Sequence, residues 1–197
     1  CGIMNSRKMI LNPNGLDSQH YVEELANGDT VDLESFISSA SQSLNSVFVD
    51  VTSSPAIAEK TANILKKGIS VVSASKLANA MNQDYYNSIR ENSKAAGALF
   101  KYETNVGAGL PIIETLQTLL ITGDTVEKIE GIMSGTLSYL FSQFDGSIPF
   151  SELVKYAQGN GCTEPDPRDD LNGVDVGRKI LILVRETGAQ LEFEDVS

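Results

Sequence analysis

The chain has 197 residues, of which 41% are hydrophobic and 21% are charged. These proportions are ordinary for a soluble globular protein with one large core or two small ones. No apolar run approaches the roughly 18 residues that a membrane helix requires, and residues 1–10 lack the basic start and apolar stretch of a signal peptide. The net charge of −11 makes nucleic acid and membrane surfaces poor partners, but it does not exclude an anionic cofactor.

The few cysteine and histidine residues limit the kinds of metal site and catalytic mechanism that the chain can have. Cys1 and Cys162 provide neither a disulfide framework nor a metal-ligand spacing, so a reducing cytoplasm is the simplest expected location. The single histidine, His20, is expected to lie on the surface without a role. Acid–base chemistry would therefore depend on Lys, Asp, Glu or Tyr side chains.

The first half of the chain alternates between strand and helix patterns. It opens with an interrupted strand over 3–11, which ends in the turn signal 12–15. The expected helices are 17–26, 32–44, 55–67 and 84–96. The expected later strands are 46–51, 69–73 and 99–102. Strands and helices that alternate with short links indicate a parallel sheet covered on its faces.

The second half has a different rhythm and indicates a second domain, with the boundary near Glu103. A helix over 110–121 and a strand over 126–133 are followed by helices expected at 136–144, 150–158 and 169–188. The fold class is therefore α/β, with an incomplete Rossmann-type parallel sheet in 1–103 and an α+β domain in 104–197. A strand followed by Gly-x-Gly-x-x-Gly is missing, so either the chain begins after that cofactor motif or it is not a nucleotide-binding protein.

Polar residues follow two of the expected strands. Thr52–Ser54 comes after 46–51, and Ser73–Lys76 comes at the end of 69–73. Ligands of open parallel sheets bind beyond the carboxyl ends of the strands. Helix capping by Ser54 before Pro55 and an exposed loop lysine at Lys76 are the alternatives.

Two glycine-containing loops are further candidates. Glu103 precedes a loop in which backbone carbonyls and one carboxylate could surround a hard cation, although a tight turn into a helix at Pro111 explains the same residues. Small residues over Gly131–Thr136 would let a ligand approach the amides at a helix start. Capping by Ser134 or Thr136 is the alternative there.

The densest polar segment runs from Gly161 to Lys179. Its two prolines favour an extended approach to the last helix, and the next two aspartates suit the positive end of that helix. Asp175 and Lys179 are four residues apart and share a polar arc with Arg185. The ordinary interpretation is a solvent-facing ion pair worth roughly 0.3–0.5 kcal/mol. If the arc lines a cleft instead, the carboxylate would hold a lysine that is partly removed from water and is usable as an acid–base group.

The segment Glu164–Lys179, with the sequence EPDPRDDLNGVDVGRK, resembles the signature of homoserine dehydrogenases. The resemblance extends, in the order of the family, over Asp50–Ser54, Val71–Lys76, Tyr102–Pro111 and Gly131–Phe141. It is closest to the dehydrogenase part of bifunctional aspartokinase–homoserine dehydrogenases.

This resemblance implies an enzyme that reversibly reduces aspartate 4-semialdehyde to homoserine with NAD(P)H, in threonine and methionine biosynthesis. Lys179 would be the acid–base residue, and Asp175 would act beside it. Glu164 and Asp175 would bind the substrate, while Gly135 and Thr136 would line its pocket. The segment 104–197 would then be the substrate-binding, catalytic and dimerisation domain of a homodimer or higher homo-oligomer.

The resemblance also implies where the cofactor and a cation would bind. Lys76 would lie between substrate and nicotinamide, Thr52 would contact the cofactor, and Gly161 would approach it through its backbone. A monovalent cation, sodium or potassium, would be held by one carboxylate and three carbonyl groups, those of Glu103 and of Val106, Ala108 and Leu110. The sequence does not decide between NADP and NAD, although the basic residues of Ser6-Arg7-Lys8 lean slightly toward a phosphate.

The chain departs from the family pattern in three respects. Ser75 replaces the usual asparagine and Cys162 the usual tyrosine. The phosphate-binding glycine turn is expected before Cys1, and the family continues beyond Ser197. The chain by itself is therefore expected to bind cofactor poorly, and a non-catalytic dimerisation or structural module is the alternative function.

Overall fold

The computed structural model describes residues 1–164 and 166–196, which form two compact units. Unit 1 comprises Cys1–Asp50, Glu59–Val72 and Ser88–Lys101. Unit 2 comprises Val51–Ala58, Ser73–Asn87 and Tyr102–Ser197. The two short segments of unit 2 that interrupt unit 1 include Thr52 and Lys76. The compact units are built from alternating segments of the chain and do not divide it at one position. The domain boundary near Glu103 therefore stays a prediction.

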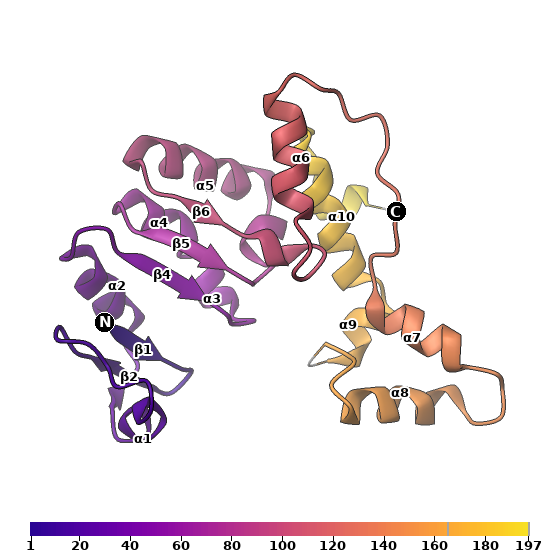
Figure 1. Cartoon of the computed structure of the whole chain (residues 1–197), viewed down its shortest axis with the longest axis horizontal. Coiled ribbons are helices and arrows are strands. Elements are labelled where there is room, and N and C mark those ends of the chain that lie inside the picture. The colour runs from indigo at the N-terminus through magenta and orange to yellow at the C-terminus, as the bar shows by residue number, and fades with distance from the viewer. Residues whose placement is uncertain (165, 197) are drawn as a thin grey trace. The chain divides into compact units, whose positions relative to one another are not determined.

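Unit 1 contains the predicted parallel sheet. Its strands are β4 (Val47–Asp50), β5 (Ser70–Ser73, whose last residue belongs to unit 2) and β6 (Phe100–Lys101), in the order β4-β5-β6. β5 and β6 pair in parallel, with Val71 opposite Phe100, and the arrows of all three strands point the same way in Figure 1. The expected α/β fold with a parallel sheet is confirmed.

The N-terminal segment of unit 1 forms a small antiparallel sheet of β1 (Gly2–Met4), β2 (Lys8–Leu11) and β3 (Asp29–Thr30). The expected interruption at Asn5-Ser6 is present, and it divides residues 3–11 into two antiparallel strands of a hairpin. The side chain of Asn5 accepts the backbone N–H groups of Arg7 and Lys8, both at 2.8 Å, and this turn reverses the chain.

The helices of unit 1 follow the predicted pattern with shorter bounds. They are α1 (Tyr21–Ala26), α2 (Leu33–Ser41), α4 (Thr61–Lys66) and most of α5 (Gln83–Ala96). The expected helix 55–67 is two helices, because α3 (Pro55–Ala58) ends before α4 begins. Four fully buried aliphatic residues form part of the core and come from α2, α4 and α5: Ile37, Ile64, Leu65 and Ile89.

Unit 2 is organised around α10 (Val174–Glu186), which contacts α6 (Ile112–Ile121), α9 (Pro167–Leu171) and the 3-10 helices η1 (Ala78–Ala80) and η3 (Phe193–Asp195). A further 3-10 turn, η2 (Glu103–Asn105), precedes α6. The single helix predicted over 169–188 is interrupted, because Gly173 adopts a left-handed conformation with φ of 78° between α9 and α10. Leu181, Ile182 and Leu183 of α10 are buried.

A second hydrophobic cluster in unit 2 joins α7 (Gly135–Gln143) to α8 (Phe150–Gly159) through Leu140, Leu153 and Ala157. The strand predicted over 126–133 is absent from the described residues, where 124–134 contains no strand and nearly all of 124–132 is exposed. An extended segment forms a strand only when its backbone groups pair with a neighbouring strand. None of the described helices is long and apolar enough to cross a membrane.

Candidate active site

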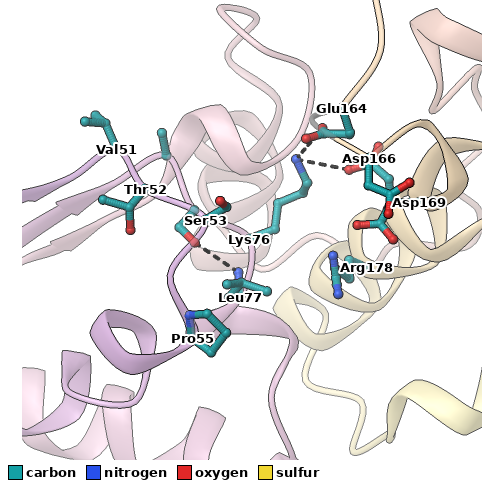
Figure 2. Close-up of a pocket in the computed structure, with 13 residues that line it drawn as sticks. Val51, Thr52, Ser53, Pro55, Lys76, Leu77, Glu164, Asp166, Asp169 and Arg178 are labelled. Atoms are coloured by element: carbon teal, nitrogen blue, oxygen red, sulfur yellow. Dashed lines mark hydrogen bonds and ion pairs between the residues drawn. The ribbon is translucent and has the colours of Figure 1, made fainter. Parts of the chain in front are cut away.

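The Lys76 segment leaves the end of β5 in a tight turn. The hydroxyl of Ser73 accepts the backbone N–H of Ser75 at 3.1 Å, and the carbonyl of Lys76 accepts the N–H of Ala80 at 3.1 Å. The turn and the start of η1 therefore fix the backbone on both sides of Lys76. Figure 2 shows the Lys76 side chain extending toward Glu164.

The first turns of α10 place a carboxylate between two lysines. Asp175 Oδ2 lies 2.6 Å from Lys179 Nζ, and Asp175 Oδ1 lies 3.1 Å from Lys76 Nζ. Lys179 Nζ also donates to the carbonyl of Met133 at 2.9 Å, and Lys76 Nζ contacts Glu164 Oε1 at 3.3 Å. We call the four side chains Lys76, Glu164, Asp175 and Lys179 the lysine–carboxylate cluster.

Burial separates this cluster from the solvent-facing ion pair that spacing alone suggested. The side chain of Asp175 is 4% exposed, and those of Lys179 and Lys76 are 17% and 19% exposed. Among the described residues, Asp175 Oδ1 has no aligned hydrogen-bond donor, so its contact with Lys76 is ionic. The ordinary surface interpretation was therefore wrong for Asp175 and Lys179.

The charges of the cluster hold two groups in their ionised forms. Burial alone lowers the pKa of Lys76, but the carboxylates of Asp175 and Glu164 outweigh this and raise that pKa above its ordinary value. Burial alone raises the pKa of Asp175, but the hydrogen bond from Lys179 and the charge of Lys76 lower that pKa on balance. Near neutral pH, Asp175 is therefore a carboxylate and Lys76 an ammonium ion.

The segment before α9 positions Glu164. Its backbone N–H donates to Asp170 Oδ2 at 2.8 Å, and Asp170 is only 2% exposed. The hydroxyl of Thr136 donates to the carbonyl of Cys162 at 2.9 Å. Asp166 caps α9 by accepting the N–H of Arg168, while Pro165 of the predicted extended approach lies outside the described residues. Sequence reasoning assigned Asp170 to the helix dipole and did not anticipate this contact.

Three cavities of unit 2 meet at the cluster. The first, of about 570 Å³, is the Lys76 pocket, lined by Thr52, Ser53, Ser75, Lys76, Glu164 and Asp175 among others (Figure 2). The second, of about 530 Å³, is the loop pocket, lined by Lys76, Val106, Ala108, Leu110, Gly135, Glu164 and Lys179 among others. The third, of about 420 Å³, is the Cys162 pocket, lined by Gly135, Thr136, Gly161, Cys162, Glu164, Asp175 and Lys179 among others. The predicted substrate-binding and cofactor-binding residues are thus brought together around one cluster.

Glu103 is the one predicted site residue that is not among the described residues lining these cavities. Its carboxylate accepts the N–H groups of Ile113 at 2.8 Å and Glu114 at 2.9 Å, and so caps α6. The carbonyl of Leu110 accepts the N–H of Ile112 at 2.9 Å. The cation set therefore stays a prediction, beside the turn-into-helix alternative that this geometry also satisfies.

Hydroxyl side chains make local hydrogen bonds at two of the candidate segments. Ser134 Oγ accepts the N–H of Leu137 at 3.0 Å and caps α7, and Thr52 Oγ1 accepts the N–H of Ser54 at 3.1 Å.

The single histidine, His20, is exposed and contacts Asp17 at 2.8 Å. Within 1–164 and 166–196, no group of three or more His, Cys, Asp or Glu side chains is arranged to hold a metal ion.

Comparison with known protein families assigns both halves of the chain to one family. Residues 5–103 match the family model of the homoserine dehydrogenase NAD-binding domain, and residues 111–197 match that of homoserine dehydrogenase. The chain therefore belongs to the homoserine dehydrogenase family.

Individual relatives give the same result. The bifunctional aspartokinase/homoserine dehydrogenase of Haemophilus influenzae is 48% identical over 100% of this chain and 24% of its own length. A crystal structure of a Candida auris protein of unknown function has a TM-score of 0.81 and 38% identity, over 95% of this chain and 54% of that one. A hyperthermophilic archaeal homoserine dehydrogenase in complex with NADPH has a TM-score of 0.78 over 100% of this chain and 64% of that one, and at 22% identity it supports the fold alone. The chain spans about a quarter of the length of the curated relatives it matches.

Proposed function

We propose that this chain carries the substrate-binding and proton-transfer residues for the interconversion of aspartate 4-semialdehyde and homoserine. The observation that supports this most strongly is the buried Asp175 carboxylate between the ammonium groups of Lys76 and Lys179, at 3.1 Å and 2.6 Å. Family membership supports the same chemistry.

The substrate is an amino acid, and carboxylates are the groups that recognise its ammonium. Glu164 and Asp175 are the carboxylates of the cluster, and both line the Cys162 pocket together with Gly135 and Thr136. Glu164 is oriented by the hydrogen bond from its backbone to Asp170. An ammonium ion in this pocket would give the partly exposed Glu164 a second charged donor beside Lys76.

Lys179 is the proposed acid–base residue. Its ammonium group is held by Asp175 and by the carbonyl of Met133, and it faces both the loop pocket and the Cys162 pocket. In the reducing direction Lys179 would donate a proton from Nζ to the aldehyde oxygen, and in the oxidising direction it would accept the proton of the hydroxyl. Asp175 fixes the direction in which Nζ points.

The Lys76 pocket has a donor set that fits the nicotinamide end of a dinucleotide. The hydroxyls of Thr52 and Ser53 and the ammonium of Lys76 supply hydrogen-bond donors, while Val51 and Pro55 supply apolar surface. Gly161, at the Cys162 pocket, has no side chain to obstruct an approach to its backbone. The bound cofactor would supply or accept the hydride, and Lys76 would hold a fixed positive charge beside it. The proposed dinucleotide is NADP or NAD.

A monovalent cation at Glu103, Val106, Ala108 and Leu110 is part of the proposal. Carboxylate and carbonyl oxygens are the ligands that hard cations prefer, and the three carbonyl residues line the loop pocket. Activity in sodium or potassium salts should exceed activity in the salt of a large organic cation, and equal activities would remove the cation from the proposal.

The oligomeric state, a homodimer or higher homo-oligomer, and the cytoplasmic location also stay predictions.

The decisive experiment measures homoserine-dependent reduction of NADP in protein that contains this chain. We expect Lys179→Ala to lower kcat by about 1,000-fold, because it removes the acid–base group. Lys94→Ala, which changes an exposed lysine on α5, is the matched control and should leave kcat unchanged. Full activity in Lys179→Ala would contradict the assignment. No activity in the unsubstituted protein would favour the alternative of a non-catalytic module.

A further inference from the structure

Arg185, near the end of α10, is a buried cation that the proposed chemistry does not use. It is only 2% exposed, although the sequence pattern placed it on the polar arc of the helix. Its guanidinium also lies over the ring of Tyr86, at 5.1 Å from the ring centre. Removing an arginine from water to this extent is costly unless its donors are matched.

The N–H donors of Arg185 are matched by acceptors in two other segments, 79–81 and 191–192. Nη1 donates to the carbonyls of Asn79 at 3.0 Å and Met81 at 2.6 Å. Nε and Nη2 donate to the carbonyl of Leu191 at 3.0 Å and 2.6 Å, and Nη2 lies 3.4 Å from Glu192 Oε2. Most partners are therefore backbone carbonyls, whose positions define the path of the chain.

The segment that receives Nη1 is the one that carries Lys76. The carbonyl of Lys76 accepts the N–H of Ala80, so Lys76 and η1 belong to one hydrogen-bonded turn. Arg185 fastens this turn to α10, and α10 also carries Asp175 and Lys179. The other side of the turn is fastened by Asn79, whose side chain donates to Asn105 Oδ1 at 2.9 Å.

We propose that Arg185 is a positioning residue that sets the distance from Lys76 to Asp175 and thereby the geometry of the lysine–carboxylate cluster. The pair Asp175–Lys179 lies within one helix at a spacing of four residues, so it forms without help. The contact between Lys76 and Asp175 joins two segments and depends on how they are held together. Only the planar guanidinium can donate to the carbonyls of Asn79, Met81 and Leu191 at once, and a lysine cannot reproduce this fork.

A test that needs no enzyme activity is the rate at which an amine-acylating reagent labels each lysine, followed by mass spectrometry. In Arg185→Lys we expect labelling of Lys76 to rise about fivefold, because its segment opens locally. Labelling of Lys179 should change little, because its partner lies on the same helix. The exposed Lys94 serves as the internal standard.

The matched control is Arg90→Lys. Arg90 lies over the ring of Phe100 at 5.7 Å within unit 1, so the same substitution is made at another arginine–aromatic contact. We expect it to leave the labelling of Lys76 unchanged. If Arg185→Lys fails to fold, Glu192→Gln weakens the same clamp more mildly and should raise labelling of Lys76 about twofold.

Two results would overturn the inference. One is unchanged labelling of Lys76 in folded Arg185→Lys, or in Glu192→Gln where Arg185→Lys does not fold. The other is equal increases at Lys76 and Lys179, which would assign Arg185 to general stability.

The kinetic consequence rests on the proposed function. Arg185→Lys should lower kcat by about 30-fold, because a displacement of the order of an ångström is costly in catalysis. KM for homoserine should change much less, since the substrate carboxylates Glu164 and Asp175 stay in place. If the unsubstituted protein is inactive, the proposed function fails, while the labelling result still decides the role of Arg185.

Discussion

Two ion-paired groups lie within one short stretch of this chain, and burial is the difference between them that matters most for reactivity. Asp166 and Arg168 form a fork with nitrogen–oxygen distances of 2.6–3.0 Å, and Asp175 and Lys179 form a contact of 2.6 Å. The side chains of the first pair are 43% and 85% exposed, whereas those of the second pair are 4% and 17% exposed. Short distances are therefore common to both, and burial is what sets them apart.

The difference in burial changes what each pair can do. The hydrogen bond from Arg168 lowers the pKa of Asp166 to about 2, but water and salt surround both partners. At Asp175 the lysines must also overcome the effect of burial, which acts in the opposite direction on the pKa. Only the buried group can present an ammonium to a ligand with the surrounding water excluded. Spacing identifies a pair, and packing decides whether that pair can be reactive.

The largest effect on stability is expected from Asp175→Asn. It leaves Lys76 and Lys179 partly buried without their shared carboxylate, and we expect the free energy of unfolding to fall by about 3 kcal/mol. Denaturation by urea, followed by circular dichroism, measures this change. Asp166→Asn keeps an oxygen that can cap α9 and should leave the midpoint unchanged. Similar losses in both variants would remove the distinction between the two pairs.

The next largest effect is the pH dependence of the stability that Asp175 and Lys76 contribute. The pKa of Asp175 is lowered from 3.8 on folding, so its contribution to stability is present above pH 3.8 and is lost as pH falls below it. The pKa of Lys76 is raised from 10.5, so its contribution is present below pH 10.5 and is lost as pH rises above it. The difference in unfolding free energy between the unsubstituted protein and Asp175→Asn should be constant between about pH 5 and pH 9. A steep change within that range would contradict the assigned ionisation states.

The smallest expected effect is the response to salt. Screening by about 1 M salt should move the pKa of the exposed Asp166 back toward 3.8, because counter-ions reach both partners. The lowered pKa of Asp175 should persist under the same conditions, because its side chain is buried. Titration of the two carboxyl carbons by nuclear magnetic resonance compares them within one sample. Equal shifts at the two positions would show that burial does not protect the cluster.

Much of the fold follows from local patterns in the sequence. The strand–helix alternation of the first half is a local property, and α5, β4, β5 and β6 lie close to where they were expected. The errors arise where longer-range contacts decide. A strand over 126–133 needs a partner strand, and the break at Gly173 depends on a left-handed conformation that spacing does not reveal.

The candidate site likewise has a part that the sequence predicts and a part that depends on contacts between distant segments. The resemblance identifies Lys76, Glu164 and Lys179 as residues of interest, but nothing local shows that Lys76 reaches Asp175 across a separation of 99 positions. Arg185 and Asp170 were missed because a charged residue on a helix is usually exposed. Their burial depends on carbonyl groups and backbone amides supplied by other segments.

The proposed proton transfer by Lys179, held by the buried carboxylate, is tested most directly by rescue of Lys179→Ala with small primary amines during homoserine-dependent reduction of NADP. Methylamine should restore kcat by about tenfold, because an amine in the vacated space beside Asp175 can take the place of Nζ. Lys76→Ala should show no such recovery, since Lys76 supplies a fixed charge. Equal rescue of both variants, or none in Lys179→Ala, would contradict the role of Lys179 in proton transfer.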